Sequence, residues 1–215
     1  MEYIYNSDNI IDFIIKGNIF NYAWFINNIK SIIESYITKC QFMYLNKDIL
    51  KDKINSIINN IKQNENIKNT DRISCVFKYI NNINDVLKIK FPLGICHGDL
   101  TLSNILIDID NLNLYLIDFL DSFIESPILD IVKIRQDTKY LWSLNMCNYN
   151  YDKNKIIILF DDIDNKLNNY FKKYNFYIKG YKYFQVLNLL RVLQYSKNED
   201  ISEKLINNIL SCYSD

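Results

Sequence analysis

Residues 96–119 of this sequence read CHGDLTLSNILIDIDNLNLYLIDF, and they are the most informative part of the chain for its fold. A polar loop comes first and is followed by two short apolar runs, residues 104–109 and 112–117. The turn-forming pair Asp110-Asn111 separates these runs. Short apolar runs on either side of such a pair are typical of a β-hairpin. The stretch therefore predicts a loop followed by a strand, a turn and a second strand.

Three polar side chains of this stretch have the chemistry that phosphoryl transfer from ATP requires. One aspartate must accept or orient the proton of the attacking hydroxyl, and an asparagine and a second aspartate must hold the Mg²⁺ ions that bridge the phosphates. Protein kinases arrange these groups as H-R-D-L-x-x-x-N followed by D-F-G. Here Asn104 lies five residues after Asp99, which is the same offset, and Asp118 follows an apolar strand. The hairpin would give such a site rigid support.

The string resembles the signature of the aminoglycoside phosphotransferase and choline kinase family, which reads HGDxxxxN followed by an I-D-F/W element. Gly98 stands where protein kinases have arginine, and the resemblance covers roughly residues 90–140. It implies that Asp99 is the catalytic base and that Asn104 and Asp118 bind Mg²⁺ and, through it, the nucleotide. ATP would be the co-substrate.

The resemblance also implies supporting residues. His97 would fix the loop through hydrogen bonds, and Asp130, in the first turn of the next helix, would brace the same loop. An equally good interpretation of Asp130 is a carboxylate that faces the helix macrodipole. Asp121 is a further candidate for contact with metal or substrate, although a structural role is favoured for it. Lys133 and Arg135 are predicted to be solvated.

Four other residues could be functional, but a structural role is favoured for each of them. Arg191 is predicted to be a paired structural charge. Trp142, Tyr140 and Tyr149 could line a cage for a quaternary ammonium group. Core packing is the favoured interpretation for these three, because the chain contains 17 tyrosines.

The remainder of the chain has helical periodicity. Before residue 91 it predicts an almost entirely helical half, and Ser126-Pro127 is an N-cap followed by proline at the first helical position. The predicted helices cover residues 9–40, 47–63, 70–88, 126–144, 154–173, 178–196 and 200–212. The penultimate one is apolar on most sides and should be central to the core.

These patterns predict an α+β fold, mainly α, with residues 1–215 in a single domain. The resemblance implies a protein-kinase-like C-terminal lobe in which a small β-hairpin carries the catalytic loop, with the catalytic and metal-binding segment at residues 93–130. The glycine-rich loop and the strand lysine of the N-terminal β-lobe are not found. That lobe is encoded on a separate chain or lost, is replaced by a helical cap, or is absent because the protein no longer catalyses.

Composition narrows the possible functions. The 25 basic and 25 acidic residues cancel, which argues against nucleic acid as a partner. The first residues do not resemble a signal peptide, and no apolar run approaches the ~20 residues that cross a bilayer. These features predict a cytoplasmic protein without membrane contact. Five scattered cysteines argue against a disulfide framework and a zinc site.

The sequence therefore predicts an ATP- and Mg²⁺-dependent phosphotransferase that acts on a hydroxyl of a small molecule. A sugar, an amino alcohol such as choline, or an aminoglycoside would fit. The alternative is a truncated, catalytically inactive kinase-like lobe that serves as a binding or scaffolding module. A hydrolase that uses His97 has weak support because the GxSxG nucleophile elbow is absent.

Overall fold

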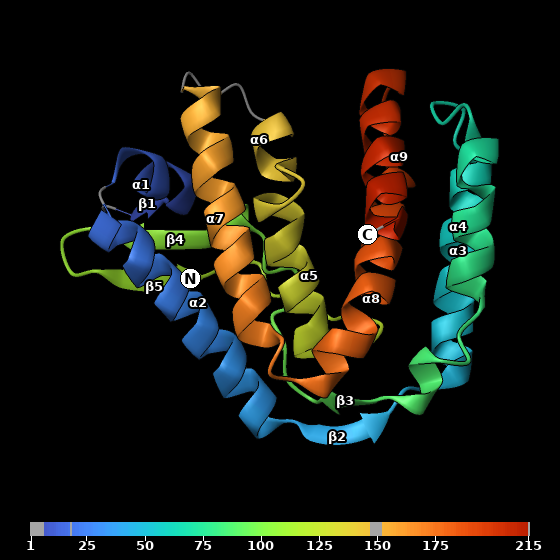
Figure 1. Cartoon of the computed structure of the whole chain (residues 1–215), viewed down its shortest axis with the longest axis horizontal. Helices are drawn as coiled ribbons and strands as arrows, with labels where there is room; N and C mark the ends of the chain where they lie inside the picture. Colours follow the sequence, from blue (N-terminus) through green and yellow to red (C-terminus); the bar gives the residue numbers. More distant parts are fainter. Residues whose placement is uncertain (1–6, 18, 147–151, 215) are drawn as a thin grey trace. The chain divides into compact units, whose positions relative to one another are not determined.

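The computed structural model describes residues 7–17, 19–146 and 152–214. In these residues the protein is mainly helical and has small β-sheets (Figure 1), which confirms the prediction of an α+β fold that is mainly α. The chain divides into two compact units. The first consists of Met1–Gln41 and Pro92–Lys173, and the second of Phe42–Phe91 and Tyr174–Asp215.

A three-stranded antiparallel sheet lies in the first unit, in the order β1-β4-β5. Its strands are β1 (Ser7–Asn9), β4 (Ile105–Asp108) and β5 (Asn113–Leu116). The predicted hairpin is confirmed, since Ile105 pairs with Leu116 and Asp108 pairs with Asn113. The Asp108 carboxylate closes the turn by accepting hydrogen bonds from the backbone N–H groups of Asp110 and Asn111. Such side-chain bonds are why aspartate is common in turns.

The helices of the first unit (Figure 1) bury branched and aromatic side chains. They are α1 (Ile10–Lys16), α2 (Ile19–Lys39), α5 (Pro127–Thr138), α6 (Trp142–Met146) and α7 (Lys153–Phe171). Helix α5 contacts α2 and α7, and all of its residues are buried. A helix that is enclosed in this way can hold polar side chains only where they find partners.

Two predicted helices of the first unit are shorter in the structure. The stretch 9–40 is divided, because Gly17 caps α1 with an N–H that donates to the Phe13 carbonyl. The helix that begins at Ser126-Pro127 was predicted to reach residue 144, and it ends at Thr138. Leu141 follows with a φ of 55°, a left-handed conformation typical of helix C-termini. Periodicity alone does not reveal such a stop when the residue is not glycine.

The second unit is built around α8 (Asn175–Leu193), whose side chains are buried on most faces. This confirms that the penultimate helix is central to its core. Gly180 of α8 lies where a Cβ would come 2.6 Å from the ring of Phe91, so the close contact requires glycine. The other helices are α3 (Lys47–Gln63), α4 (Ser74–Asn81) and α9 (Glu199–Ser214), together with the 3₁₀ turns Thr70–Ile73 and Val86–Lys88.

The half before residue 91 is mainly helical, but it is less helical than predicted. Strand β1 precedes α1, and β2 (Gln41–Tyr44) pairs with β3 (Lys90–Leu93). These strands have three or four residues, which is too short for an alternating pattern to stand out. The predicted helix over 70–88 also breaks after Asn81 and continues only as a 3₁₀ turn.

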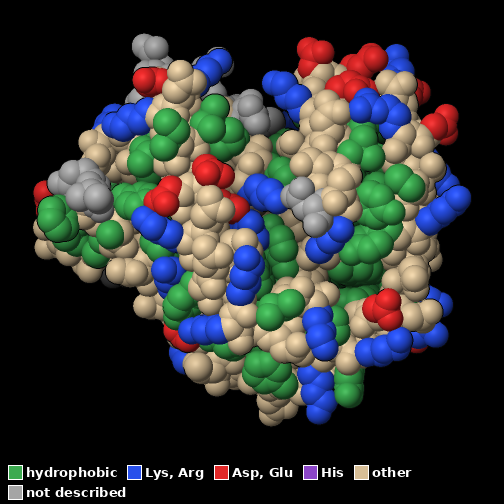
Figure 2. Space-filling view, in the orientation of Figure 1, with side chains coloured by type: hydrophobic (Ala, Val, Ile, Leu, Met, Phe, Trp, Pro, Cys, Tyr) green, Lys and Arg blue, Asp and Glu red, His purple; other side chains and the backbone are tan. Residues whose placement is uncertain are grey.

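The described helices include none that is both long and apolar enough to cross a membrane. On the face that Figure 2 shows, basic and acidic side chains are interspersed, with hydrophobic side chains between them.

Candidate active site

Hydrogen bonds between backbones bring the three predicted site residues to one end of the β4–β5 hairpin. The loop of residues 97–104, here named the HGD loop, ends in a 3₁₀ turn, Leu102–Asn104, directly before β4. The Ile117 N–H donates to the Asn104 carbonyl at 3.1 Å, so Asp118 follows immediately after a residue bonded to Asn104. The Leu120 N–H donates to the His97 carbonyl at 3.0 Å. The segment after β5 is therefore held against the start of the HGD loop.

Asp99 and Asn104 contact each other within the loop. The Asn104 Nδ2 amide donates to the Asp99 backbone carbonyl at 2.8 Å and to Asp99 Oδ2 at 3.1 Å. The remaining polar atom of this side chain, Oδ1, is of the type that binds Mg²⁺, since amide oxygens and not amide nitrogens are ligands of hard cations. These two hydrogen bonds fix the orientation of the Asn104 side chain within the loop.

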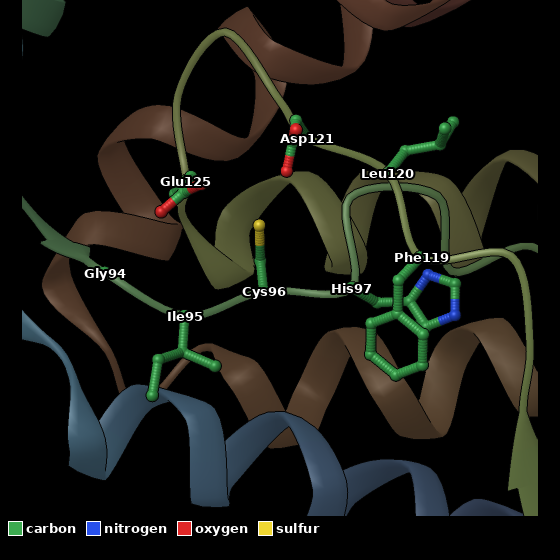
Figure 3. Close-up of a pocket in the computed structure, with 8 residues that line it drawn as sticks. All are labelled: Gly94, Ile95, Cys96, His97, Phe119, Leu120, Asp121 and Glu125. Atoms are coloured by element: carbon green, nitrogen blue, oxygen red, sulfur yellow. The ribbon is translucent and has the colours of Figure 1, made fainter.

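Asp118 is exposed and has a φ of 58°. A positive φ is strained for a residue other than glycine, and such strain is concentrated at functional sites. The next residue, Phe119, stacks on the His97 ring with centroids 4.2 Å apart and planes inclined by 27° (Figure 3). This contact links the Asp118 segment to the HGD loop.

Gly98 has a φ of 82°, and a Cβ built on it would lie 2.0 Å from the Leu120 carbonyl oxygen. Gly98→Ala should therefore push apart the HGD loop and the segment that carries Asp118. We expect a loss of about 1–3 kcal/mol in the free energy of unfolding, measured by chemical denaturation, because overpacking against backbone cannot relax by rotation of a side chain. Gly94→Ala is the comparison, because Gly94 also has a positive φ, of 140°, but a Cβ added there would make only an ordinary contact with Cys40 at 4.0 Å. It therefore measures backbone strain without the clash. Equal losses in the two variants would contradict the steric argument.

Asp130 of α5 holds the start of the HGD loop. Its side chain is fully buried and accepts hydrogen bonds from the backbone N–H groups of His97, at 2.8 Å, and Gly98, at 2.9 Å. Burial raises the pKa of Asp130 to about 7, against the two N–H donors that lower it. The His97 side chain is also buried, which lowers the pKa of the imidazole, and its Nδ1 accepts from the Asp99 N–H at 3.3 Å.

Asp137, which the sequence reasoning missed, holds the other end of the loop. Its buried carboxylate accepts from the Leu102 N–H at 2.7 Å and from the backbone and hydroxyl of Ser143. Burial raises the pKa of Asp137 to about 6. Asp137 lies seven residues after Asp130, two turns along the same helix face. Two aspartates at this spacing in an apolar helix are a signal that could have found it.

The prediction that Lys133 and Arg135 are solvated was wrong, because both are buried. Lys133 Nζ lies 2.6 Å from Asp99 Oδ1. Arg135 forms a buried ion pair with Asp164 of α7 and also donates to Asn168. Charged side chains are usually exposed, and the sequence does not reveal that the fold places the carboxylates of Asp99 and Asp164 beside these two residues.

A pocket beside the loop is lined by residues of two segments (Figure 3): Gly94, Ile95, Cys96, His97, Phe119, Leu120, Asp121 and Glu125. Asp121 lies in this pocket, and the sulfur of Cys96 points toward the segment that carries Asp121 and Glu125 (Figure 3). Burial raises the pKa of the Cys96 thiol to about 12, so it stays protonated at neutral pH. Core packing was the favoured interpretation of three aromatic residues: Tyr140 is buried and Trp142 half-buried, and Tyr149 lies outside the described residues.

The donors at this site fit Mg²⁺ better than a transition metal. Within the described residues, no group of three or more His, Cys, Asp or Glu side chains is placed to hold a metal ion. Asn104 and Asp118 supply hard oxygen atoms from two segments, and Mg²⁺ is commonly bound by one or two protein oxygens together with substrate phosphates and water. The residues present therefore fit a nucleotide-associated Mg²⁺.

Residues 61–143, less than half of the chain, match the family model described as the phosphotransferase enzyme family, APH. The match includes the HGD loop, the hairpin, Asp118 and α5, and it confirms the resemblance seen in the sequence. It points to a phosphotransferase class for the protein. No curated protein and no solved structure matches the chain.

Proposed function

We propose that this protein is an ATP- and Mg²⁺-dependent phosphotransferase with a kinase-like helical lobe, and that it phosphorylates a hydroxyl of a small molecule. The observation that supports this most is the meeting of Asp99, Asn104 and the Asp118 segment at one end of a hairpin, within a stretch that matches a phosphotransferase family. Sugars, amino alcohols and aminoglycosides are the acceptor classes to be tested first.

In the proposed reaction the acceptor oxygen forms a bond to the γ-phosphorus, and the bond from that phosphorus to the β–γ bridging oxygen breaks. Asp99 accepts or orients the hydroxyl proton. Asn104 and Asp118 would hold Mg²⁺, which when bound neutralises charge on the β- and γ-phosphates. Asp130 and Asp137 hold the backbone of the HGD loop. Asp99 and Asn104 would therefore already be in position when the substrates bind.

Asp118→Asn tests the metal-binding part of this proposal. The substitution removes the anionic oxygen and keeps the size of the side chain, so affinity for Mg²⁺-ATP should fall about tenfold or more, equivalent to about 1.4 kcal/mol. Isothermal titration of the chain with ATP, with and without Mg²⁺, measures this. The wild-type chain should bind ATP more tightly when Mg²⁺ is present.

Asp110→Asn is the matched control, because Asp110 is an exposed aspartate at the opposite end of the same hairpin. It should bind as the wild type does. Failure of the wild-type chain to bind Mg²⁺-ATP would contradict the proposed function and favour the alternative, a catalytically inactive kinase-like lobe. If Asp118→Asn bound as tightly as the control, Asp118 would not be a ligand. Transfer of labelled phosphate from ATP to a panel of sugars and amino alcohols then identifies the acceptor class.

A further inference from the structure

Helix α5 contacts the HGD loop at three successive places along one face. Asp130, Lys133 and Asp137 are spaced at i, i+3 and i+7, so they share that face. The two aspartates bind backbone N–H groups of the loop, whereas the lysine binds the side chain of Asp99. Lys133 is therefore the member of this set that touches a proposed reacting group.

The two partners of the ion pair differ in exposure. The Lys133 side chain is 7% exposed and the Asp99 side chain 24%. The ammonium group thus lies on the enclosed side of the carboxylate, and the carboxylate remains partly open to an incoming molecule. A buried cation is costly unless it is paired, so Lys133 is expected to stay on Asp99.

Each oxygen of the Asp99 carboxylate has a donor from a different element. Oδ1 is 2.6 Å from Lys133 Nζ of α5, and Oδ2 is 3.1 Å from the Asn104 amide of the 3₁₀ turn. Two donors from separate elements fix both the position and the rotation of the carboxyl plane. A base fixed in this way loses little freedom when the acceptor hydroxyl arrives.

We propose that Lys133 is a positioning residue for Asp99, and that it acts on phosphoryl transfer through that carboxylate. This inference rests on the proposed function, since it assigns Lys133 a part in that reaction. A lysine that only stabilised the loop would be redundant with Asp130 and Asp137, which already bind its backbone at both ends. The specific consequence of Lys133 is the orientation of Asp99.

Lys133→Met tests the proposal with a side chain of similar length and no charge. We expect kcat for transfer from Mg²⁺-ATP to fall about 10–100-fold, since misplacement of a reacting group by about 1 Å has an effect of that order. The KM for ATP should change less than about twofold, because Asn104 and Asp118 are untouched.

Lys133→Arg, which retains a cation, should keep more activity than Lys133→Met. Lys139→Met is the matched control, because Lys139 is an exposed lysine directly after the same helix, and it should retain wild-type kcat.

A second test compares the single variant Asp99→Asn with a double variant that also carries Lys133→Met. This comparison separates positioning of Asp99 from other roles of Lys133. If Lys133 acts through Asp99, its loss should cause no more than about a twofold further decrease in the background that lacks the carboxylate. The double variant carries neither charge and so buries no unpaired charge, whereas Asp99→Asn alone leaves Lys133 without its anion and should unfold at a lower temperature. Thermal unfolding of every variant confirms its fold.

The outcomes separate this inference from the proposed function. Absence of transfer by the wild-type chain to any acceptor, including water, would overturn the proposed function and the role of Lys133 with it. Wild-type transfer with an unchanged kcat in folded Lys133→Met would overturn the positioning role alone. The positioning role would also be overturned if Lys133→Met lowered kcat as much in the Asp99→Asn background as in the wild type. Lys133 would then act independently of Asp99.

Discussion

Asp99→Asn is expected to lower kcat by about 10²–10⁴-fold, the range that a positioned general base contributes. Asparagine keeps the shape of the side chain and an oxygen acceptor but cannot take up the proton of the acceptor hydroxyl. The variant should be less stable than the wild type, because the buried Lys133 ammonium loses its anionic partner, but it should still fold because Asp130 and Asp137 hold the loop. Transfer of labelled phosphate from ATP measures the loss, and thermal unfolding verifies the fold.

The control for this prediction is again Asp110→Asn, which changes the same chemical group outside the site and should leave kcat as it is. Mg²⁺-ATP affinity should also be preserved in Asp99→Asn, because the proposed ligands are Asn104 and Asp118. Near-normal phosphate transfer by a folded Asp99→Asn protein would refute the assignment of Asp99 as the base. A parallel loss of nucleotide affinity would instead indicate that Asp99 shapes the metal site.

Asp130→Ala should have the largest effect on stability, with about 2–6 kcal/mol lost from the free energy of unfolding. The substitution leaves the buried N–H groups of His97 and Gly98 without an acceptor, and each such group costs about 1–3 kcal/mol. The free energy of unfolding of Asp130→Asn should lie between those of the wild type and Asp130→Ala, because an amide has one oxygen acceptor where the carboxylate has two. Chemical denaturation monitored by circular dichroism measures the series.

The matched control is Asp48→Ala, which removes an exposed aspartate from the first turn of α3. It should lose only the interaction with the helix macrodipole, about 0.3–1 kcal/mol. Similar losses at the two positions would show that Asp130 is only a helix-terminus carboxylate.

The stability that Asp130 contributes should also depend on pH. Burial raises its pKa from an ordinary value of 3.8 to about 7, so between these values the folded chain retains a proton that the unfolded chain releases. The free energy of unfolding that this bound proton contributes is therefore fully present below about pH 4, and it is lost as the pH rises to about 7. The difference in stability between the wild type and Asp130→Asn should shrink over that range.

Much of the site was predictable because its spacing is local. The offset between Asp99 and Asn104, and the hairpin that returns the chain to Asp118, lie within residues 97–118, where turn chemistry and apolar alternation are readable. The long helices of both units were readable from their periodicity. The short strands β1, β2 and β3 were not, because three or four residues do not establish a period.

The sequence by itself determined which oxygen-bearing groups the chain offers, in what order and at what spacing, because these depend on covalent neighbours and on one tight turn. Only the tertiary structure decided what surrounds them. Asp137, Lys133 and Arg135 are ordinary charged residues in the sequence, and their burial depends on α5 being enclosed by other elements of its unit. The free energy of a charged group is set by solvent access and by partners distant in the chain. Neither can be read from the residues next to it.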